Sequence, residues 1–410
     1  MRSFAARHLF RDCALAVALL LLLLAAAAAG SGVTGSRTRQ LRHNSRRALA
    51  AAAQQGGNTN SRPQVELAVF GDSLSDTGNT FRAAGVPQAD LYYQGRYSNG
   101  PVWIDYLSAA VANTTQLTVR NYAYGGATAC GGAGAPSATY PFIRDLPAQT
   151  AAFLNLSSSA AAAQGGGAGG GGGGGARRRL VPMNWIGNED VRVGAGGVAD
   201  EKILVQAAIR AGTDIDQRAV TTLAIAVTGC RIAWAQRLLG GAGEAAWGGG
   251  QRGPDRVLVL LPLMRLDLLP EAPDPLKPRV REIVAVLNAV LKGSAAALQQ
   301  DLAAAATPDD DGGGSRGARL LVLPEATEPL VLSVRPPFNS SGPCFNQPLD
   351  ALQPVPAAEL RPCPNPNDHA FYDQLHPSTR VHEALALREV LPALRQAGLL
   401  DKLGVGRPPP

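Results

Sequence analysis

Aromatic residues are scarce in this sequence, at 5% of 410 residues. The arginines that cluster at residues 37–47 and 177–179 have no aromatic side chains interleaved with them. Proteins that bind single-stranded nucleic acid combine positive charge with aromatic stacking. The net charge of +6 is therefore better explained by solvated arginines in linker segments, and we expect no nucleic-acid partner.

A long apolar run occurs once, at residues 14–29, after Arg2, Arg7 and Arg11. Its 16 residues are fewer than the ~20 that a membrane-spanning helix needs, and it ends in small residues, as a secretory signal does. We predict a signal peptide at residues 1–30, a secreted, extracellular or cell-wall protein, and no stable membrane span after cleavage. An uncleaved anchor and an organelle-directing segment are the alternatives.

Cysteine is also scarce, and one of the five lies in the signal segment. The other four are Cys130, Cys230, Cys344 and Cys363. An even number fits the disulfide bonds of an exported protein, and Cys344 and Cys363, which flank a Pro-rich stretch, are the pair we expect first. Four buried free thiols are the alternative. Three glycosylation sequons, consistent with a glycoprotein, begin at Asn113, Asn155 and Asn339.

Hydrophobic residues make up 46% of the chain, enough for a large core, and no internal repeat is present. Apolar runs predict buried strands at residues 65–70, 117–124, 180–186, 257–262 and 320–324. Helical patterns lie at residues 102–112, 200–239 with a break near Gly212, 279–306 and 379–397. Strands that alternate with long helices indicate a parallel sheet covered on both faces.

Low-complexity segments interrupt this plan. Residues 31–63 form a polar linker, residues 157–176 are almost entirely Ser, Ala and Gly, and residues 308–317 are rich in Asp and Gly. Such segments cannot bury enough apolar surface to offset the entropy lost on ordering. We therefore predict one domain at residues 64–403 with two disordered insertions, followed by a short tail at 404–410.

Three of the five histidines lie close together near the C-terminus, at His369, His376 and His382. Asp373 and His376 are three residues apart, a spacing that lets the carboxylate accept the Nδ1 proton and leaves Nε2 free as a base. A metal site built from His369, Asp373 and His376 is a competing interpretation. Surface histidines beside a helix start are the structural alternative.

A serine follows the first predicted strand, in the sequence Gly71-Asp72-Ser73-Leu74-Ser75. A serine that leaves a strand and enters a helix places its hydroxyl near the positive end of the helix dipole, where an oxyanion is stabilised. The simpler interpretation is that Ser73 only caps a helix.

Taken together, these two segments resemble those of the GDSL, or SGNH, family of serine esterases and lipases. Residues 71–79 (GDSLSDTGN) are similar to the family's first block and residues 373–377 (DQLHP) to its last, while residues 363–373 resemble the secreted plant-type branch. The resemblance implies a flavodoxin-like, three-layer α/β/α sandwich around a central, mainly parallel five-stranded sheet. It also implies that Ser73 is the nucleophile, His376 the base and Asp373 the residue that orients the base, with no cofactor and no metal.

Two further segments resemble the blocks that complete the family's oxyanion hole, to which Ser73 also contributes its backbone N–H. In residues 121–127 (NYAYGGA) the backbone donor is expected at Gly125, with Gly126 as second choice. The other block has Gly-x-Asn-Asp in the family, whereas this sequence has Asn188 one position early and Glu189 where the asparagine is expected. We expect Asn188 to be the third donor through a local backbone shift, because a carboxylate there would oppose the oxyanion.

The sequence thus predicts a secreted serine hydrolase that cleaves carboxylic esters, whether lipid esters, acetylated carbohydrates or small esters, through an acyl-enzyme on Ser73. Its partner is a small-molecule or polymer-linked ester. An acyltransferase that uses the same acyl-enzyme, and a catalytically impaired binding protein, are the alternatives. The absence of a G-x-S-x-G motif argues against an α/β-hydrolase. No extended hydrophobic lid is evident, which favours soluble short-chain esters.

Overall fold

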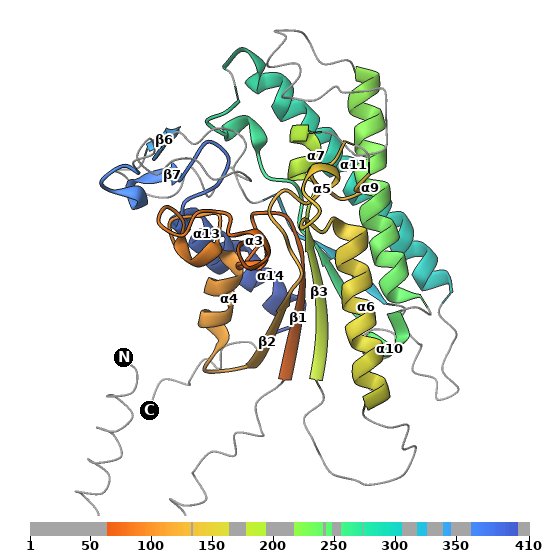
Figure 1. The fold of residues 1–410 in the computed structure, drawn as a ribbon. Helices are drawn as coiled ribbons and strands as arrows, with labels where there is room; N and C mark the ends of the chain where they lie inside the picture. The colour runs from red at the N-terminus through yellow and green to blue at the C-terminus, as the bar shows by residue number, and fades with distance from the viewer. Residues whose placement is uncertain are drawn as a thin grey trace, which may run out of the picture. The chain divides into compact units, whose positions relative to one another are not determined.

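Five parallel strands form the central sheet of the computed structural model (Figure 1). They are β1 (Gln64–Gly71), β2 (Gln116–Asn121), β3 (Arg178–Trp185), β4 (Val257–Leu260) and β5 (Arg319–Val322). Their order is β2-β1-β3-β4-β5, and every neighbouring pair is parallel. All five predicted strands are therefore present. The inner strands β1 and β4 are buried apolar runs, whereas β2 and β5, at the two edges of the sheet, are only partly buried.

The structure describes residues 64–132, 134–163, 178–193, 217–240, 243–247, 256–272, 274–305, 318–325, 339–345 and 362–400. All of them belong to one compact unit, residues 62–410. The predicted signal peptide, linker, second insertion and tail lie outside the described residues, as do residues 200–216 of the second predicted helix.

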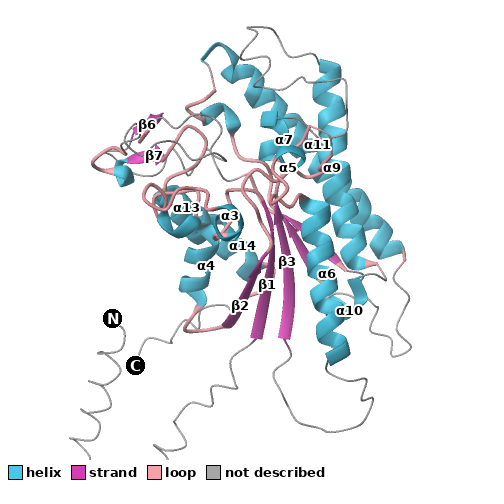
Figure 2. Ribbon diagram, viewed as in Figure 1, coloured by secondary structure: helices cyan, strands magenta, loops and turns pink. Residues whose placement is uncertain are grey.

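Side chains of each strand alternate between two cores. In β1, Val65, Leu67 and Val69 enter one core, and Ala68 and Phe70 enter the other. The first core is covered by α4 (Trp103–Val111), α13 (Thr379–Ala384), the π-helical segment η10 (Leu385–Val390) and α14 (Leu391–Gln396). The second is covered by α6 (Leu146–Ala163), α9 (Gln217–Leu239) and α10 (Glu244–Trp247), on the other side of the sheet (Figure 2). The expected three-layer α/β/α sandwich is thereby confirmed.

Helix α11 (Lys277–Ala304) is long and apolar enough to cross a membrane by length and composition. It packs instead against α9 and β5, and it contributes Val280, Ile283 and Leu287 to one core and Leu291 to the other. We interpret it as a core helix of the folded domain.

The start predicted for the first disordered insertion, at residue 157, is too early in the sequence. Helix α6 continues to Ala163, seven residues into the segment at 157–176 that was expected to be disordered. Alanine has the highest helix propensity, and it extends a helix that Phe153 and Leu154 have already anchored in the core. Residues 164–176 lie beyond the described part.

The remaining short elements connect this framework. They are α3 (Asn79–Ala84), η3 (Tyr93–Gly95), α5 (Pro136–Thr139), α7 (Asn188–Val193), η6 (Leu266–Leu268), η7 (Asp274–Leu276), β6 (Asn339–Pro343), η9 (Pro366–Asp368) and β7 (His369–Phe371). The short strands β6 and β7 form a separate two-stranded sheet.

Two disulfide bonds join the four cysteines of the described region. Cys344 pairs with Cys363, as expected, and Cys130 pairs with Cys230 across 100 residues. The alternative of four free thiols is therefore wrong.

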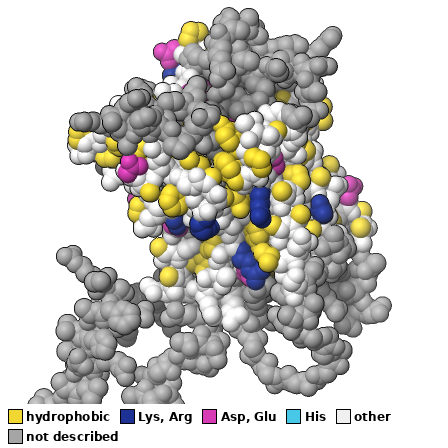
Figure 3. Space-filling view, viewed as in Figure 1, with side chains coloured by type: hydrophobic (Ala, Val, Ile, Leu, Met, Phe, Trp, Pro, Cys, Tyr) yellow, Lys and Arg dark blue, Asp and Glu magenta, His cyan; other side chains and the backbone are white. Residues whose placement is uncertain are grey.

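On the surface shown in Figure 3, Lys and Arg side chains lie apart from one another among hydrophobic and uncharged ones. The described residues on that face form no continuous basic patch.

Candidate active site

Three neighbouring parallel strands have their carboxyl ends at the same end of the sheet. Each is followed closely by a predicted site residue. Ser73 follows β1, Gly125 follows β2 and Asn188 follows β3. Because β1 lies between β2 and β3, the strand order changes direction at this point. Open parallel sheets bind their ligands in the crevice outside the strand ends at such a switch point. The fold thus gathers the three segments where a ligand is expected.

The structure brings Ser73, His376 and Asp373 into one chain of hydrogen bonds. His376 Nε2 lies 2.9 Å from Ser73 Oγ, although 303 positions separate the two residues. His376 Nδ1 lies 2.7 Å from Asp373 Oδ2 and 3.0 Å from Oδ1. His376 and Asp373 are 4% and 2% exposed, so this contact is shielded from water. The arrangement is that of a nucleophile, a base and an orienting carboxylate.

Asp373 is held as an anion in spite of its burial. Burial acts to raise its pKa, but the charge of His376 and hydrogen bonds from His376, Tyr92 and Leu375 outweigh burial and lower the pKa below its usual value. The backbone N–H groups of Leu375 and His376 both donate to Oδ1 at 2.7 Å. An ionised carboxylate only accepts hydrogen bonds, so Nδ1 of His376 carries the proton and Nε2 accepts from the Ser73 hydroxyl.

His369 and His382 are not part of the hydrogen-bonded chain of Ser73, His376 and Asp373. His369 Nδ1 is 3.3 Å from the carbonyl oxygen of Gly342, on the small sheet. Within the described ranges, no group of three His, Cys, Asp or Glu side chains could hold a metal ion, so the alternative site of His369, Asp373 and His376 does not assemble. His376 and His382 are both buried, which rules out the interpretation as surface histidines.

Ser73 lies in a turn and not at a helix start, which corrects the expectation of a helix dipole. The carbonyl oxygen of Asp72 accepts from the N–H groups of Ser75 and Asp76, and α3 begins only at Asn79. The Asp76 carboxylate binds the N–H groups of Gly78, Asn79 and Thr80 at that helix start. The N-cap residue is Gly78, and the carboxylate that accepts from the first turn of the helix is that of Asp76, so Ser73 does not cap a helix.

The backbone N–H of Gly125 is already committed to this cap, which argues against our first choice for the oxyanion donor. It donates to Asp76 Oδ2 at 3.1 Å and to Thr80 Oγ1 at 2.8 Å. Glycine is needed there because a Cβ would overlap the Tyr97 side chain. The next residue, Gly126, is buried and has a positive φ of 77°, a conformation that glycine adopts without strain. Gly126, our second choice, is the better candidate.

Asn188 opens α7 and lies in the wall beside Ser73. Its Oδ1 accepts from the Met264 N–H at 3.2 Å and its Nδ2 donates to Asp72 Oδ2 at 3.2 Å, which fixes the orientation of the carboxamide. Since an amide nitrogen carries two hydrogens, the second can donate to a ligand. Glu189 lines the same pocket but is less buried than Asn188.

Asp72 connects these parts. Burial raises its pKa to about 7, although hydrogen bonds from Leu74 and Asn188 act to lower it, and the charge of Glu189 adds to the increase. Its Oδ1 accepts from the Leu74 N–H at 3.1 Å. Asp72 thus joins the Ser73 turn to the Asn188 side chain.

A pocket opens at Ser73, His376 and Asn188, with about 550 Å³ of space when the open solvent at its entrance is included. Most of its wall is aliphatic, with side chains from Leu74, Val191, Met264, Leu266, Leu269, Ala272, Val280 and Leu375. Asp72, Glu189 and Glu271 are its other polar members. Such a wall fits a hydrocarbon chain beside the serine hydroxyl.

Two residues that contact the site, Asp72 and Tyr92, have no predicted role in the sequence analysis. Asp72 lies in residues 71–79, directly before Ser73, and this position could have indicated that it belongs to the site. Tyr92 donates its hydroxyl to Asp373 Oδ2 from 281 positions away. The only signal in the sequence is that Tyr92 and Tyr93 are consecutive aromatic residues in a chain that has few of them.

Comparisons with known proteins match most of this domain. The sequence model of the family described as GDSL-like Lipase/Acylhydrolase matches residues 67–388. Phosphatidylcholine-sterol acyltransferase of Aeromonas hydrophila is 46% identical over 72 residues, 17% of this chain and 21% of that protein. Thermolabile hemolysin of Vibrio parahaemolyticus is 41% identical over 64 residues, 15% of this chain and 14% of that protein. The matches thus span less than a quarter of either relative.

Among solved structures, a lipase from a goat rumen metagenome overlaps 82% of this chain and 99% of its own, with a TM-score of 0.38 and 11% sequence identity.

Proposed function

The chain belongs to the GDSL-like lipase/acylhydrolase family, and on that premise we propose that it hydrolyses carboxylic esters through an acyl-enzyme on Ser73. The observation that carries the proposal is the 2.9 Å contact between Ser73 Oγ and His376 Nε2, with Asp373 on the other side of the imidazole. A hydroxyl is a weak nucleophile unless an adjacent base takes its proton. This geometry supplies such a base in a site that opens to a pocket.

In the proposed reaction, His376 takes the Ser73 proton as Oγ attacks the ester carbonyl carbon. The developing oxyanion accepts hydrogen bonds from the backbone N–H groups of Ser73 and Gly126 and from Nδ2 of Asn188. The imidazolium, stabilised by Asp373, then protonates the leaving alcohol, and the acyl group stays on Oγ. Water that loses its proton to His376 releases the acid and restores the serine.

The pocket supports an acyl chain of several carbons. Its aliphatic wall begins at Leu74, next to Ser73, and extends to Val280 at the start of α11. Burial of each CH₂ group is worth about 0.8 kcal/mol, so a chain that fills the pocket binds better than an acetyl group. We therefore propose esters of medium-chain acids in place of the short-chain esters expected from the sequence.

Transfer of the acyl group to an alcohol is the second candidate. It shares every step up to the acyl-enzyme, and it is favoured by the name of one relative, which is an acyltransferase. Product analysis with an added alcohol acceptor separates the two, because a transferase yields a new ester where a hydrolase yields free acid. An inactive binding protein is less well supported, because Asn188 lines the pocket beside Ser73 and its Nδ2 has a second hydrogen to donate.

Export of the protein is part of the proposal. Two disulfide bonds fit an oxidising compartment, since cytosolic proteins rarely keep such bonds. The glycosylation sequons at Asn113, Asn155 and Asn339 begin with exposed asparagines. An extracellular or cell-wall location therefore remains our proposal.

The test is hydrolysis of p-nitrophenyl esters from acetate to palmitate by the purified protein and by Ser73→Ala. We expect activity that peaks at an intermediate chain length and is lost in the variant. Equal activity of the two proteins would refute the role of Ser73.

A further inference from the structure

Asp373 receives one hydrogen bond from far along the chain. Its local donors are the backbone N–H groups of Leu375 and His376 and the imidazole of His376, all within three residues. The remaining donor is the Tyr92 hydroxyl, which lies 2.5 Å from Oδ2. Oδ2 is also the oxygen nearest to His376 Nδ1, so both groups donate to the same atom. The phenol therefore contacts the atom that orients the base.

Tyr92 has little freedom to move away from this position. Its side chain is 2% exposed. Its ring meets Tyr372 edge-on, with centroids 5.4 Å apart and planes at 89°, and meets Phe345 at 5.8 Å and 67°. The Phe345 and Tyr372 rings in turn lie 4.8 Å apart. Aromatic pairs in edge-to-face geometry stabilise one another, so the three rings fix the direction of the Tyr92 hydroxyl.

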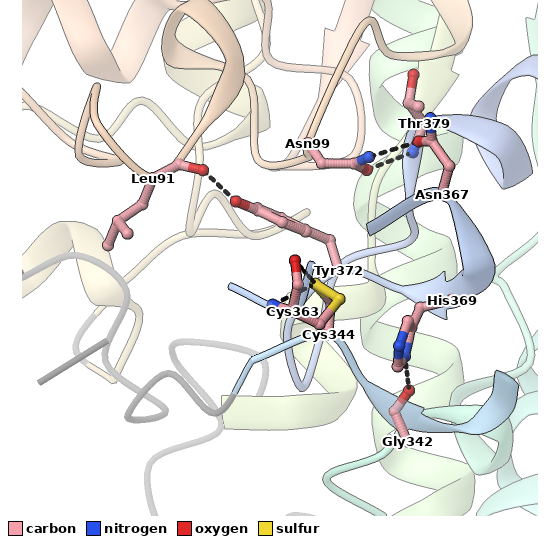
Figure 4. The surroundings of a disulfide bond; sticks show 9 residues. All are labelled: Leu91, Asn99, Gly342, Cys344, Cys363, Asn367, His369, Tyr372 and Thr379. Carbon is pink, nitrogen blue, oxygen red and sulfur yellow. Dashed lines mark hydrogen bonds between the residues drawn. A yellow bond between two sulfur atoms is a disulfide. The ribbon is translucent and has the colours of Figure 1, made fainter. Parts of the chain in front are cut away.

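The same cluster is tied to the segment that carries Asp373. The Tyr372 hydroxyl donates to the carbonyl oxygen of Leu91, which directly precedes Tyr92 (Figure 4). The Cys344–Cys363 disulfide lies beside it, and the Cys344 N–H donates to the Phe371 carbonyl at 3.0 Å. Residues 91 and 92 are thus held by residues 372 and 373 through two reciprocal hydrogen bonds.

We propose that Tyr92 is a positioning residue for the reaction, which fixes the Asp373 carboxylate against His376 through its hydroxyl. This inference rests on the proposed function of Ser73 and goes beyond it. In a buried site a hydrogen bond to a charged group is strong, and it both orients the carboxylate and shares its negative charge. Without the phenol hydroxyl, Oδ2 keeps only the imidazole, and the carboxylate is freer to rotate.

The test measures how fast a fluorophosphonate labels Ser73 as a function of pH. The reaction needs the serine, the base and the carboxylate, but it needs no identified substrate. Tyr92→Phe removes the hydroxyl that contacts Asp373. Tyr372→Phe is the matched control, because it removes a hydroxyl from the same aromatic cluster that binds the Leu91 carbonyl and not the carboxylate.

We expect Tyr92→Phe to lower the labelling rate about tenfold, the factor that a free-energy change of about 1.4 kcal/mol produces. We also expect the acidic limb of the pH profile to move to higher pH, because a carboxylate with one donor fewer attracts the imidazolium proton more strongly. Three other groups, Asp72, His382 and Tyr97, also interact with His376. Both variants keep all three, so these groups do not account for a difference between the two pH profiles. Tyr372→Phe keeps the hydrogen bond from Tyr92 to Asp373, so it should lower the rate less than Tyr92→Phe and leave the pH profile unchanged.

A double-mutant cycle with Asp373→Asn tests whether Tyr92 acts through the carboxylate. Positioning predicts that Tyr92→Phe slows labelling little in the Asp373→Asn background. A rate loss of equal size in both backgrounds, or equal profiles for Tyr92→Phe and Tyr372→Phe, overturns the proposal. The fraction of protein that is labelled when the reaction is complete reports the fraction that is folded. If Tyr92→Phe is not labelled at all, the variant is unfolded. That result also counts against a positioning role, because Tyr92 is then needed for the core.

Failure of the inference is distinct from failure of the proposed function. If wild-type protein is labelled at Ser73 and the tyrosine variants behave alike, only the role of Tyr92 is wrong. If wild-type protein is not labelled, the proposed function itself is wrong.

Discussion

Replacing Asn188 by alanine should remove one of the three donors to the oxyanion. The side chain is 8% exposed and is held at both ends, by the Met264 N–H on its oxygen and by Asp72 on its nitrogen. A donor that is already fixed in place needs no reorganisation during the reaction. Loss of one such donor typically lowers kcat by about 10²–10³, or roughly 2.7–4 kcal/mol of transition-state stabilisation.

The assay is steady-state hydrolysis of a p-nitrophenyl ester by wild type and Asn188→Ala. The oxyanion forms in the transition state, so we expect kcat to fall and KM to change little. The Met264 N–H also loses its acceptor, at a stability cost of about 1–3 kcal/mol, so thermal unfolding is measured alongside.

Glu189→Ala is the neighbouring control, and it should not lower kcat, because an ionised carboxylate has no proton to donate. If Asn188→Ala stays within about threefold of wild type, Asn188 is not a donor. A strong increase of kcat in Glu189→Asn would likewise refute the shifted position of the asparagine.

Three further predictions concern the base, the pocket and stability. Asp373→Asn should lower kcat by about 10⁴, as loss of the orienting carboxylate does in Ser-His-Asp enzymes, with the unfolding midpoint little changed. Ala272→Phe should reduce kcat/KM for an octanoate ester at least tenfold and for an acetate ester less than threefold, because the added ring fills the pocket; equal losses would place Ala272 outside the acyl site. Burial, with a smaller effect from the charge of His376, lowers the pKa of His382 from 6.5 to about 3, so the folded state keeps this ring neutral. Stability should therefore fall as pH drops below 6.5, by up to about 1.4 kcal/mol per pH unit until pH 3, and His382→Leu should weaken that dependence in unfolding measurements.

The sheet and the Ser73, Asp373 and His376 cluster could be predicted from the sequence because each depends on local signals. Each strand contains a short run or alternation of apolar residues, and the three residues lie in two short blocks with a recognisable order. The closeness of Ser73 to His376 followed from the family resemblance and not from any local pattern, and the strand order was not predicted.

The surroundings of these residues could not be predicted in the same way. Asp76 reaches 49 positions along the chain to bind the Gly125 N–H, and this contact moves the expected oxyanion donor from Gly125 to Gly126. Asp76 also binds the N–H groups of Gly78, Asn79 and Thr80, where α3 begins, so the helix starts after the Ser73 turn and not at Ser73. Tyr92 reaches Asp373 across 281 positions, a distance over which no pattern in the sequence connects two residues.

The central claim is that His376 activates Ser73. The most direct measurement is peptide mapping by mass spectrometry after reaction with a fluorophosphonate, on wild type, Ser73→Ala and His376→Ala. The account predicts one adduct, on the peptide that contains Ser73, that is absent in Ser73→Ala and forms far more slowly in His376→Ala. An adduct on another residue, or labelling of His376→Ala at the wild-type rate, would contradict it.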